Sequence, residues 1–179
     1  MDKSQKGFVL WFTGLPQSGK STIADRIYQA LKEKGLELER LDGDIVRQSF
    51  TKDLGFSKED RDENIRRVGF LSKILSKHGV GVIASFIAPY KAQREGVRKE
   101  AENFVEVYCK CPLEVCEKRD TRGFYKKARN GEIENFTGVS DPYEEPENPE
   151  ITVETDKENI EQCIEKIINF LKKTGYINE

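Results

Sequence analysis

The sequence has few of the residues that build metal centres or disulfide frameworks. It contains one histidine and four cysteines, and no two cysteines form a CxxC pair. We therefore expect buried thiols in a reducing compartment rather than metal ligands. The single histidine, His78, precedes Gly79 at a predicted helix end, where a helix-terminal charge is more expected than a catalytic base.

Long hydrophobic runs and a large excess of charge are also missing. No apolar run approaches the ~20 residues of a membrane span, and no secretory leader is expected before the first predicted strand, which favours a cytoplasmic protein with no membrane partner. The net charge of -2 gives no reason to expect a nucleic-acid partner. Internal repeats and low-complexity linkers are absent as well.

Charge is nevertheless uneven along the chain. Residues 118–129 contain six basic residues and one acidic residue, whereas residues 130–150 contain seven acidic residues and no basic one. Glycine and proline interrupt this part of the chain, so it is either a solvated surface or a mobile, anion-binding lid, over about residues 119–147.

Short apolar segments alternate with helical patterns from one end to the other, which predicts an α/β fold. The 179 residues, of which 36% are hydrophobic, suit a single domain spanning residues 1–179. Strands are predicted over 7–13, 38–42, 80–86, 104–111 and 151–155, and helices over 21–34, 44–50, 57–77, 91–103, 113–120 and 157–173. The expected architecture is a five-stranded parallel sheet with helices on both faces.

A complete GxxxxGK[ST] phosphate-binding loop follows the first predicted strand and opens the first predicted helix. It consists of Gly14, Leu15, Pro16, Gln17, Ser18, Gly19, Lys20 and Ser21. Its backbone N–H groups and the helix N-terminus are expected to hold the phosphates of ATP, with Thr22 next in the helix. Lys20 should reach the β and γ phosphates, and the Ser21 hydroxyl should bind Mg²⁺.

Three further stretches carry a family resemblance. Residues 41–47 read LDGDIVR, residues 53–67 read DLGFSKEDRDENIRR, and residues 112–144 run from PLEVC through RDTRGFYKKAR to NFTG and DPYE. Together with the phosphate-binding loop, they resemble the adenylylsulfate kinases, P-loop kinases of sulfate assimilation. These enzymes transfer the γ-phosphoryl group of ATP to the 3'-hydroxyl of adenosine 5'-phosphosulfate (APS), giving 3'-phosphoadenosine 5'-phosphosulfate and ADP.

The resemblance implies a role for individual residues. APS would be bound by Asp44, Arg47, Arg61 and Asn64, with its adenine between Phe56 and Phe136, and with Ile87, Ala88 and Asn135 nearby. The basic lid would supply Arg119 to ATP, and Arg122, Lys126 and Lys127 to the acceptor. Asp42 would either organise a Mg²⁺-bound water or accept the proton of the 3'-hydroxyl. The family also suggests a homodimer.

Alternatives remain at this point for both residues and function. Phe56 could belong to the core, and Asp42 and Asp44 could be N-caps of the next helix. Pro16, Gln17 and Ala88 depart from the family pattern, and Ala88 replaces a serine that is phosphorylated in some members. The rival functions are therefore a weakened, nucleotide-binding paralogue with a regulatory role, another small-molecule P-loop kinase, or the kinase part of a larger sulfate-activating assembly.

Overall fold

The computed structural model describes residues 5–178 and contains a five-stranded sheet in which every strand is parallel to its neighbours. Its strands are β1 (Phe8–Thr13), β2 (Leu38–Asp42), β3 (Gly81–Ser85), β4 (Phe104–Lys110) and β5 (Ile151–Glu154). They lie in the order β2-β3-β1-β4-β5, so β1 and its phosphate-binding loop occupy the centre of the sheet. The predicted fold class and parallel sheet are confirmed.

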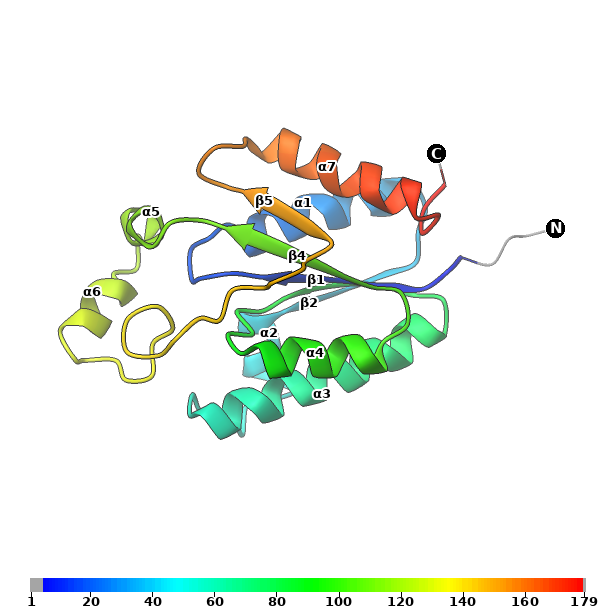
Figure 1. Ribbon diagram of the computed structural model, residues 1–179. Helices are drawn as coiled ribbons and strands as arrows, with labels where there is room; N and C mark the ends of the chain where they lie inside the picture. Colours follow the sequence, from blue (N-terminus) through cyan, green and yellow to red (C-terminus); the bar gives the residue numbers. More distant parts are fainter. Residues whose placement is uncertain (1–4, 179) are drawn as a thin grey trace.

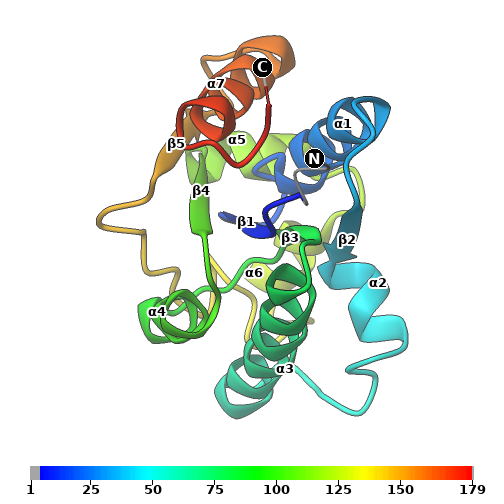
Figure 2. The same ribbon diagram turned by 90° about the vertical axis from the view of Figure 1, so that its right-hand side faces the viewer.

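Helices cover both faces of this sheet, also as predicted. The helices are α1 (Lys20–Glu33), α2 (Gly43–Gln48), α3 (Lys58–Lys77), α4 (Lys91–Glu100), α5 (Leu113–Arg119), α6 (Phe124–Arg129) and α7 (Ile160–Lys173). Helices α1 and α7 lie on one face, and α3 and α4 lie on the other (Figures 1 and 2). Helix α6 was not among the predicted helices, because its six residues lie in a stretch whose sequence was interpreted by its charge rather than by a helical period.

Strand β1 shows why the central strands have no polar alternation. Phe8 and Phe12 point to the face covered by α1 and α7, whereas Trp11 packs with α3 and α4 on the other face. Since both faces are covered, every residue of β1 is buried. The predicted core position of Trp11 is confirmed, and all four cysteines are free and buried, as expected.

The helix ends follow local hydrogen bonding, which corrects one prediction. Ser57 caps α3 by accepting a hydrogen bond from the Asp60 amide at 3.1 Å, as the sequence suggested. Helix α2, in contrast, is capped by Asp42, whose Oδ1 accepts from the Asp44 amide at 3.0 Å. Asp44 itself lies in the first turn of α2, so the alternative that Asp44 caps this helix is wrong, whereas the same alternative for Asp42 is confirmed.

Helices α5 and α6 and the chain that follows them extend beyond the carboxyl end of β4 (Figure 1). The part of this segment over about residues 119–147 is the stretch for which a lid was predicted, and we keep the name lid for it. Arg129 on α6 forms an ion pair with Glu117 on α5, so part of the basic charge of the lid is already neutralised by the neighbouring helix. Within residues 5–178, no helix has the length and apolar character needed to cross a membrane.

Candidate active site

A cleft of about 660 Å³ lies between the phosphate-binding loop, the ends of β2 and β3, and the lid. Ligand sites in parallel α/β sheets are found at the carboxyl ends of the strands. The structure brings most of the predicted residues into the lining of this cleft. They are Pro16, Gln17, Gly19, Lys20, Ser21, Thr22, Asp42, Asp44, Arg47, Phe56, Arg61, Asn64, Ile87, Ala88, Arg122, Asn135 and Phe136.

The phosphate-binding loop is tightly folded around the Lys20 side chain. Gly14 has a φ of 154°, and a Cβ atom there would lie 2.6 Å from the Cys109 carbonyl oxygen, so only glycine fits. Lys20 Nζ donates to the carbonyl oxygens of Gly14 at 3.0 Å and Leu15 at 2.6 Å. Burial lowers the pKa of Lys20 to about 8, and the carboxylate of Asp42 is among the groups that partly oppose this shift. The Lys20 ammonium group that would bind a phosphate is therefore more acidic than an exposed lysine.

Asp42 is held at the end of β2 by four donors. Its Oδ2 atom accepts hydrogen bonds from Ser21 Oγ at 2.8 Å, Ser85 Oγ at 2.9 Å and Arg40 Nη2 at 3.2 Å, while Oδ1 accepts from the Asp44 amide. Burial acts to raise the pKa of Asp42, but these hydrogen bonds and the Arg40 charge outweigh burial and lower it. The Asp42 carboxylate therefore stays ionised and fixed beside the Ser21 hydroxyl.

The opposite side of the cleft combines arginines with an exposed aromatic ring. Phe56 is 57% exposed, so the alternative that it belongs to the core is wrong. The guanidinium carbons of Arg47 and Arg61 lie 4.4 and 5.6 Å from the centre of the Phe56 ring. Arg61 also donates to the Asn135 carbonyl oxygen at 2.5 Å, which links α3 to the lid. Asn64, one turn further along α3, accepts from the Thr51 hydroxyl at 2.7 Å.

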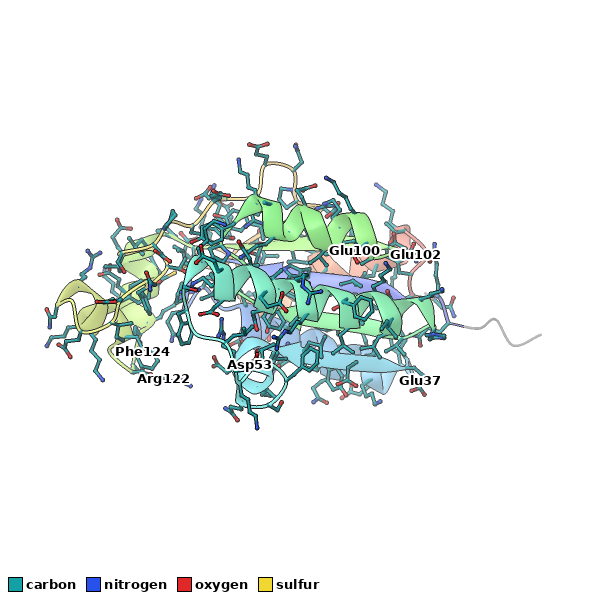
Figure 3. All side chains as sticks on the ribbon, turned by 90° about the horizontal axis from the view of Figure 1, so that it is seen from below. Glu37, Asp53, Glu100, Glu102, Arg122 and Phe124 are labelled. Carbon is teal, nitrogen blue, oxygen red and sulfur yellow. The ribbon has the colours of Figure 1, made fainter. Side chains whose placement is uncertain are left out.

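The lid contacts the phosphate-binding loop directly. Tyr125 on α6 donates from its hydroxyl to the Pro16 carbonyl oxygen at 2.8 Å, and its ring meets the Phe136 ring edge-on at 5.0 Å. Arg122 and Phe124 lie at the lid end of the molecule (Figure 3), and the Arg122 guanidinium is 5.9 Å from the Phe124 ring centre. The lid therefore brings both aromatic and cationic groups to the cleft.

Some of the predicted residues lie outside the cleft lining, and their roles stay predictions. These residues are Gly14, Leu15, Ser18, Arg119, Lys126 and Lys127. Arg119 donates to the Thr155 carbonyl oxygen at 2.6 Å, and the Thr155 hydroxyl donates to the Ser18 carbonyl oxygen at 2.8 Å. Arg119 thus reaches the phosphate-binding loop through Thr155. Lys126 and Lys127 are exposed on α6.

The predicted site residues did not include several residues that do line the cleft, among them Ser85, Tyr125, Glu134 and Thr137. Ser85 is the last residue of β3, so the rule that ligands gather at strand ends could have found it. Tyr125 and Thr137 line the cleft because the lid folds back over it, and the lid sequence has no helical or strand period that would indicate this fold.

Comparison with known proteins gives a consistent result over nearly the whole chain. A family model described as adenylylsulphate kinase matches residues 6–154. The adenylyl-sulfate kinase of Halothermothrix orenii is 54% identical over 176 residues, covering 98% of this chain and 95% of the relative, and that of Microcystis aeruginosa is 54% identical over 175 residues, covering 98% and 97%. The structure of the Mycobacterium tuberculosis APS kinase CysC in complex with AMPPNP and APS is similar with a TM-score of 0.89 and 39% identity, covering 94% of this chain and 99% of that one.

Proposed function

This chain belongs to the adenylylsulfate kinase family, and we propose that the cleft between its phosphate-binding loop and lid is the place where phosphoryl transfer to APS occurs. The protein is an ATP-using adenylylsulfate kinase of sulfate assimilation. The observation that carries the site proposal is the shared cleft: the phosphate-binding loop lines one side, and Arg47, Phe56 and Arg61 line the other. In the reaction the bond between the γ-phosphorus of ATP and the bridging β-phosphate oxygen breaks, which releases ADP. The γ-phosphoryl group forms a new bond to the 3'-oxygen of APS, and the proton of the 3'-hydroxyl passes to water.

The phosphate-binding loop would hold ATP at the centre of the sheet. Backbone N–H groups of the loop and the N-terminus of α1 attract the phosphate oxygens, and the Lys20 ammonium neutralises charge on the transferring group. Binding requires Lys20 Nζ to exchange the Gly14 and Leu15 carbonyl oxygens for phosphate oxygens. A phosphate is the stronger partner because the resulting hydrogen bond joins opposite charges.

Ser21 and Asp42 fit a Mg²⁺ site shared with ATP. Mg²⁺ prefers oxygen ligands and is commonly held by one or two protein groups together with phosphates and waters. The Ser21 hydroxyl and the Asp42 carboxylate are 2.8 Å apart, and both line the cleft. When bound, Mg²⁺ would neutralise charge on the β and γ phosphates. Between the two roles predicted for Asp42, we favour orienting a metal-bound water, because a carboxylate with a lowered pKa is a poor proton acceptor.

The acceptor would occupy the side formed by α2, α3 and the lid. The Arg47 and Arg61 guanidinium groups suit the phosphosulfate anion, and the exposed Phe56 ring offers a stacking surface for adenine, with Phe136 as the second ring. Asp44, Asn64, Ile87, Ala88, Asn135 and Arg122 complete the proposed acceptor set.

We extend the proposal to the organisation of the whole protein. Residues 1–179 would act as one kinase domain with a lid over about residues 119–147 that closes on both substrates. The family suggests a homodimer, and buried free thiols favour a cytoplasmic, reducing location.

The burial of Lys20 gives a pH prediction. Because the protonated form binds phosphate and the pKa of Lys20 is about 8, the free protein loses this charge as the pH rises through 8. We expect kcat/KM for ATP to be flat below this pH and to fall above it, approaching about tenfold for each pH unit. Steady-state kinetics between pH 6.5 and 9.5 measure this directly. A flat profile up to pH 9.5 would contradict the assignment of Lys20 as the phosphate-binding cation in the free protein.

The alanine at position 88 predicts direct transfer without a phosphoenzyme. Ala88 is 2% exposed with a φ of 42°, and a serine hydroxyl there would add at most one hydrogen bond, worth about 1 kcal/mol. We therefore expect Ala88→Ser to change turnover by less than about tenfold, which corresponds to about 1.4 kcal/mol in the barrier. Intact-mass analysis after incubation with ATP alone should show no added phosphate on the unmodified protein. An inert parent protein beside a rapidly turning-over serine variant would sink the direct-transfer proposal.

A further inference from the structure

Helix α4 carries a buried arginine whose contacts lie behind the cleft rather than within it. Arg94 is 2% exposed and is not part of the cleft lining. Its Nη1 atom donates to the Ala88 carbonyl oxygen, and its Nη2 atom donates to the Glu144 carbonyl oxygen, both at 2.6 Å. A single guanidinium therefore bridges the segment after β3 to the C-terminal part of the lid at Tyr143 and Glu144, which we call the lid exit.

These two segments are also bonded to each other. We call residues 87–89 the acceptor loop, because they line the proposed acceptor side of the cleft. The Glu144 amide donates to the Pro89 carbonyl oxygen at 2.8 Å, and a Glu144 carboxylate oxygen accepts from the Lys91 amide at 2.7 Å. Ala88 has a φ of 42°, a conformation that is unfavourable for a residue with a Cβ and persists only where neighbouring groups hold it. The Arg94 hydrogen bond to the Ala88 carbonyl oxygen is such a restraint.

The end of β1 joins the same polar cluster. The Thr13 hydroxyl donates to the Ile87 carbonyl oxygen at 2.6 Å and lies 2.9 Å from the Tyr143 hydroxyl. Thr13 directly precedes Gly14, where the phosphate-binding loop begins. The acceptor loop is thus tied both to the strand that carries the ATP site and to the lid.

The charge of Arg94 is balanced by Glu106 on β4, which is 3% exposed. Arg94 Nε lies 2.9 Å from Glu106 Oε1, an ion pair whose N–H is not aligned well enough for a hydrogen bond. Arg98, one turn further along α4, also pairs with Glu106, at 3.0 Å, and with Glu150. Arg98 shares the electrostatic role of Arg94, but its hydrogen bonds go only to carboxylates and not to the acceptor loop or to Glu144.

We propose that Arg94 is a positioning residue for APS: it holds the acceptor loop and the lid exit in the shape that the acceptor substrate requires. The inference rests on the proposed function of the cleft. A fully desolvated guanidinium suits this role, because its planar array of donors bonds two carbonyl oxygens in a fixed geometry while its charge pairs with the Glu106 carboxylate. A lysine ammonium at the same place is a single point of charge and cannot span both carbonyl oxygens.

The test compares Arg94→Lys with Arg98→Lys, a matched change on the same helix. We expect Arg94→Lys to raise KM for APS at least tenfold while KM for ATP changes by less than about threefold. Arg98→Lys should leave both KM values within about twofold. Urea unfolding of both variants accompanies the kinetics, because a purely structural role for Arg94 would lower stability in the two variants alike and leave both KM values unchanged.

Should Arg94→Lys not be recovered folded, Arg94→Met combined with Glu106→Gln removes the buried pair together and leaves Arg98 with Glu150. This double variant must show the same selective rise in KM for APS. An unchanged KM for APS, or an equal rise for APS and ATP, overturns the role of Arg94. Arg61→Ala separates this failure from a failure of the proposed acceptor site: if Arg61→Ala also leaves KM for APS unchanged, the site assignment itself is wrong.

Discussion

Replacing Lys20 with alanine should lower kcat at least about 10²-fold while the protein stays folded. Lys20 is the cation of the phosphate-binding loop, and removing a group that stabilises transition-state charge in a closed site costs about 10²- to 10³-fold or more. The fold should survive because Lys20 lies at the end of the loop, where its Nζ donates hydrogen bonds to the loop residues Gly14, Leu15 and Ser18.

Lys34→Ala is the control for this variant, because Lys34 is an exposed lysine at the other end of α1 and does not line the cleft. The measurement is steady-state turnover of both purified variants, with circular dichroism to check that each is folded. Turnover of folded Lys20→Ala near the level of the control would remove the phosphate-binding loop from the mechanism.

Arg61→Ala should weaken APS binding about 30-fold and leave ATP binding nearly unchanged. A hydrogen bond to a charged group contributes about 1.5–3 kcal/mol, and the loss of about 2 kcal/mol corresponds to about 30-fold in affinity. Arg61 is 8% exposed, lines the cleft and contacts the carbonyl oxygens of Phe56 and Asn135, so its removal also loosens the link between α3 and the lid. Asn64→Ala, one turn along the same helix, should act in the same direction.

Arg66 provides the matched control for the acceptor site. It lies on α3 as well, but it is exposed, pairs with Glu63 and is not part of the cleft lining. Titration calorimetry with APS and with a non-hydrolysable ATP analogue should show normal affinities for Arg66→Ala. If Arg61→Ala loses ATP affinity and keeps APS affinity, the two substrate sites have been assigned to the wrong sides of the cleft.

Much of the fold was predictable because its signals are local. The run from Phe8 to Thr13 has no polar alternation, which indicates a strand buried on both faces, and the glycines and Lys20 that follow it identify the loop and the start of α1. The strand order could not be predicted in this way, because no sequence pattern in or near β1 indicates that its neighbours in the sheet are β3 and β4. The short helix α6 and the exact helix ends were missed for a related reason, since they depend on a few caps and lid contacts.

The residues of the candidate site likewise fall into those that the sequence indicated and those that depend on contacts between distant segments. Asp42 ends a predicted strand and Asp44 lies just beyond it, so their position drew attention to them, whereas the roles of Arg61 and Asn64 were implied only by the family resemblance of residues 53–67. Nothing in the sequence indicated the contacts of Arg94, because its partners are backbone carbonyl oxygens. Ala88 lies in the loop before α4, and Glu144 lies in the lid, 50 residues along the chain. The rival assignment to another small-molecule kinase is superseded by 54% identity to adenylyl-sulfate kinases over nearly the whole chain.

The most direct test of the account is a coupled ADP-release assay of the purified protein with ATP, Mg²⁺ and a panel of acceptors, joined to identification of the product. With APS as the acceptor, one ADP should form for each APS molecule consumed. Mass spectrometry with phosphorus NMR should show one new phosphoryl group on the 3'-oxygen of the product. AMP, which keeps the adenine and ribose but lacks the sulfate, should be a far poorer acceptor, because the arginine side of the cleft is expected to bind the phosphosulfate. Equal turnover with AMP, or no turnover of the folded protein with APS, would contradict the account.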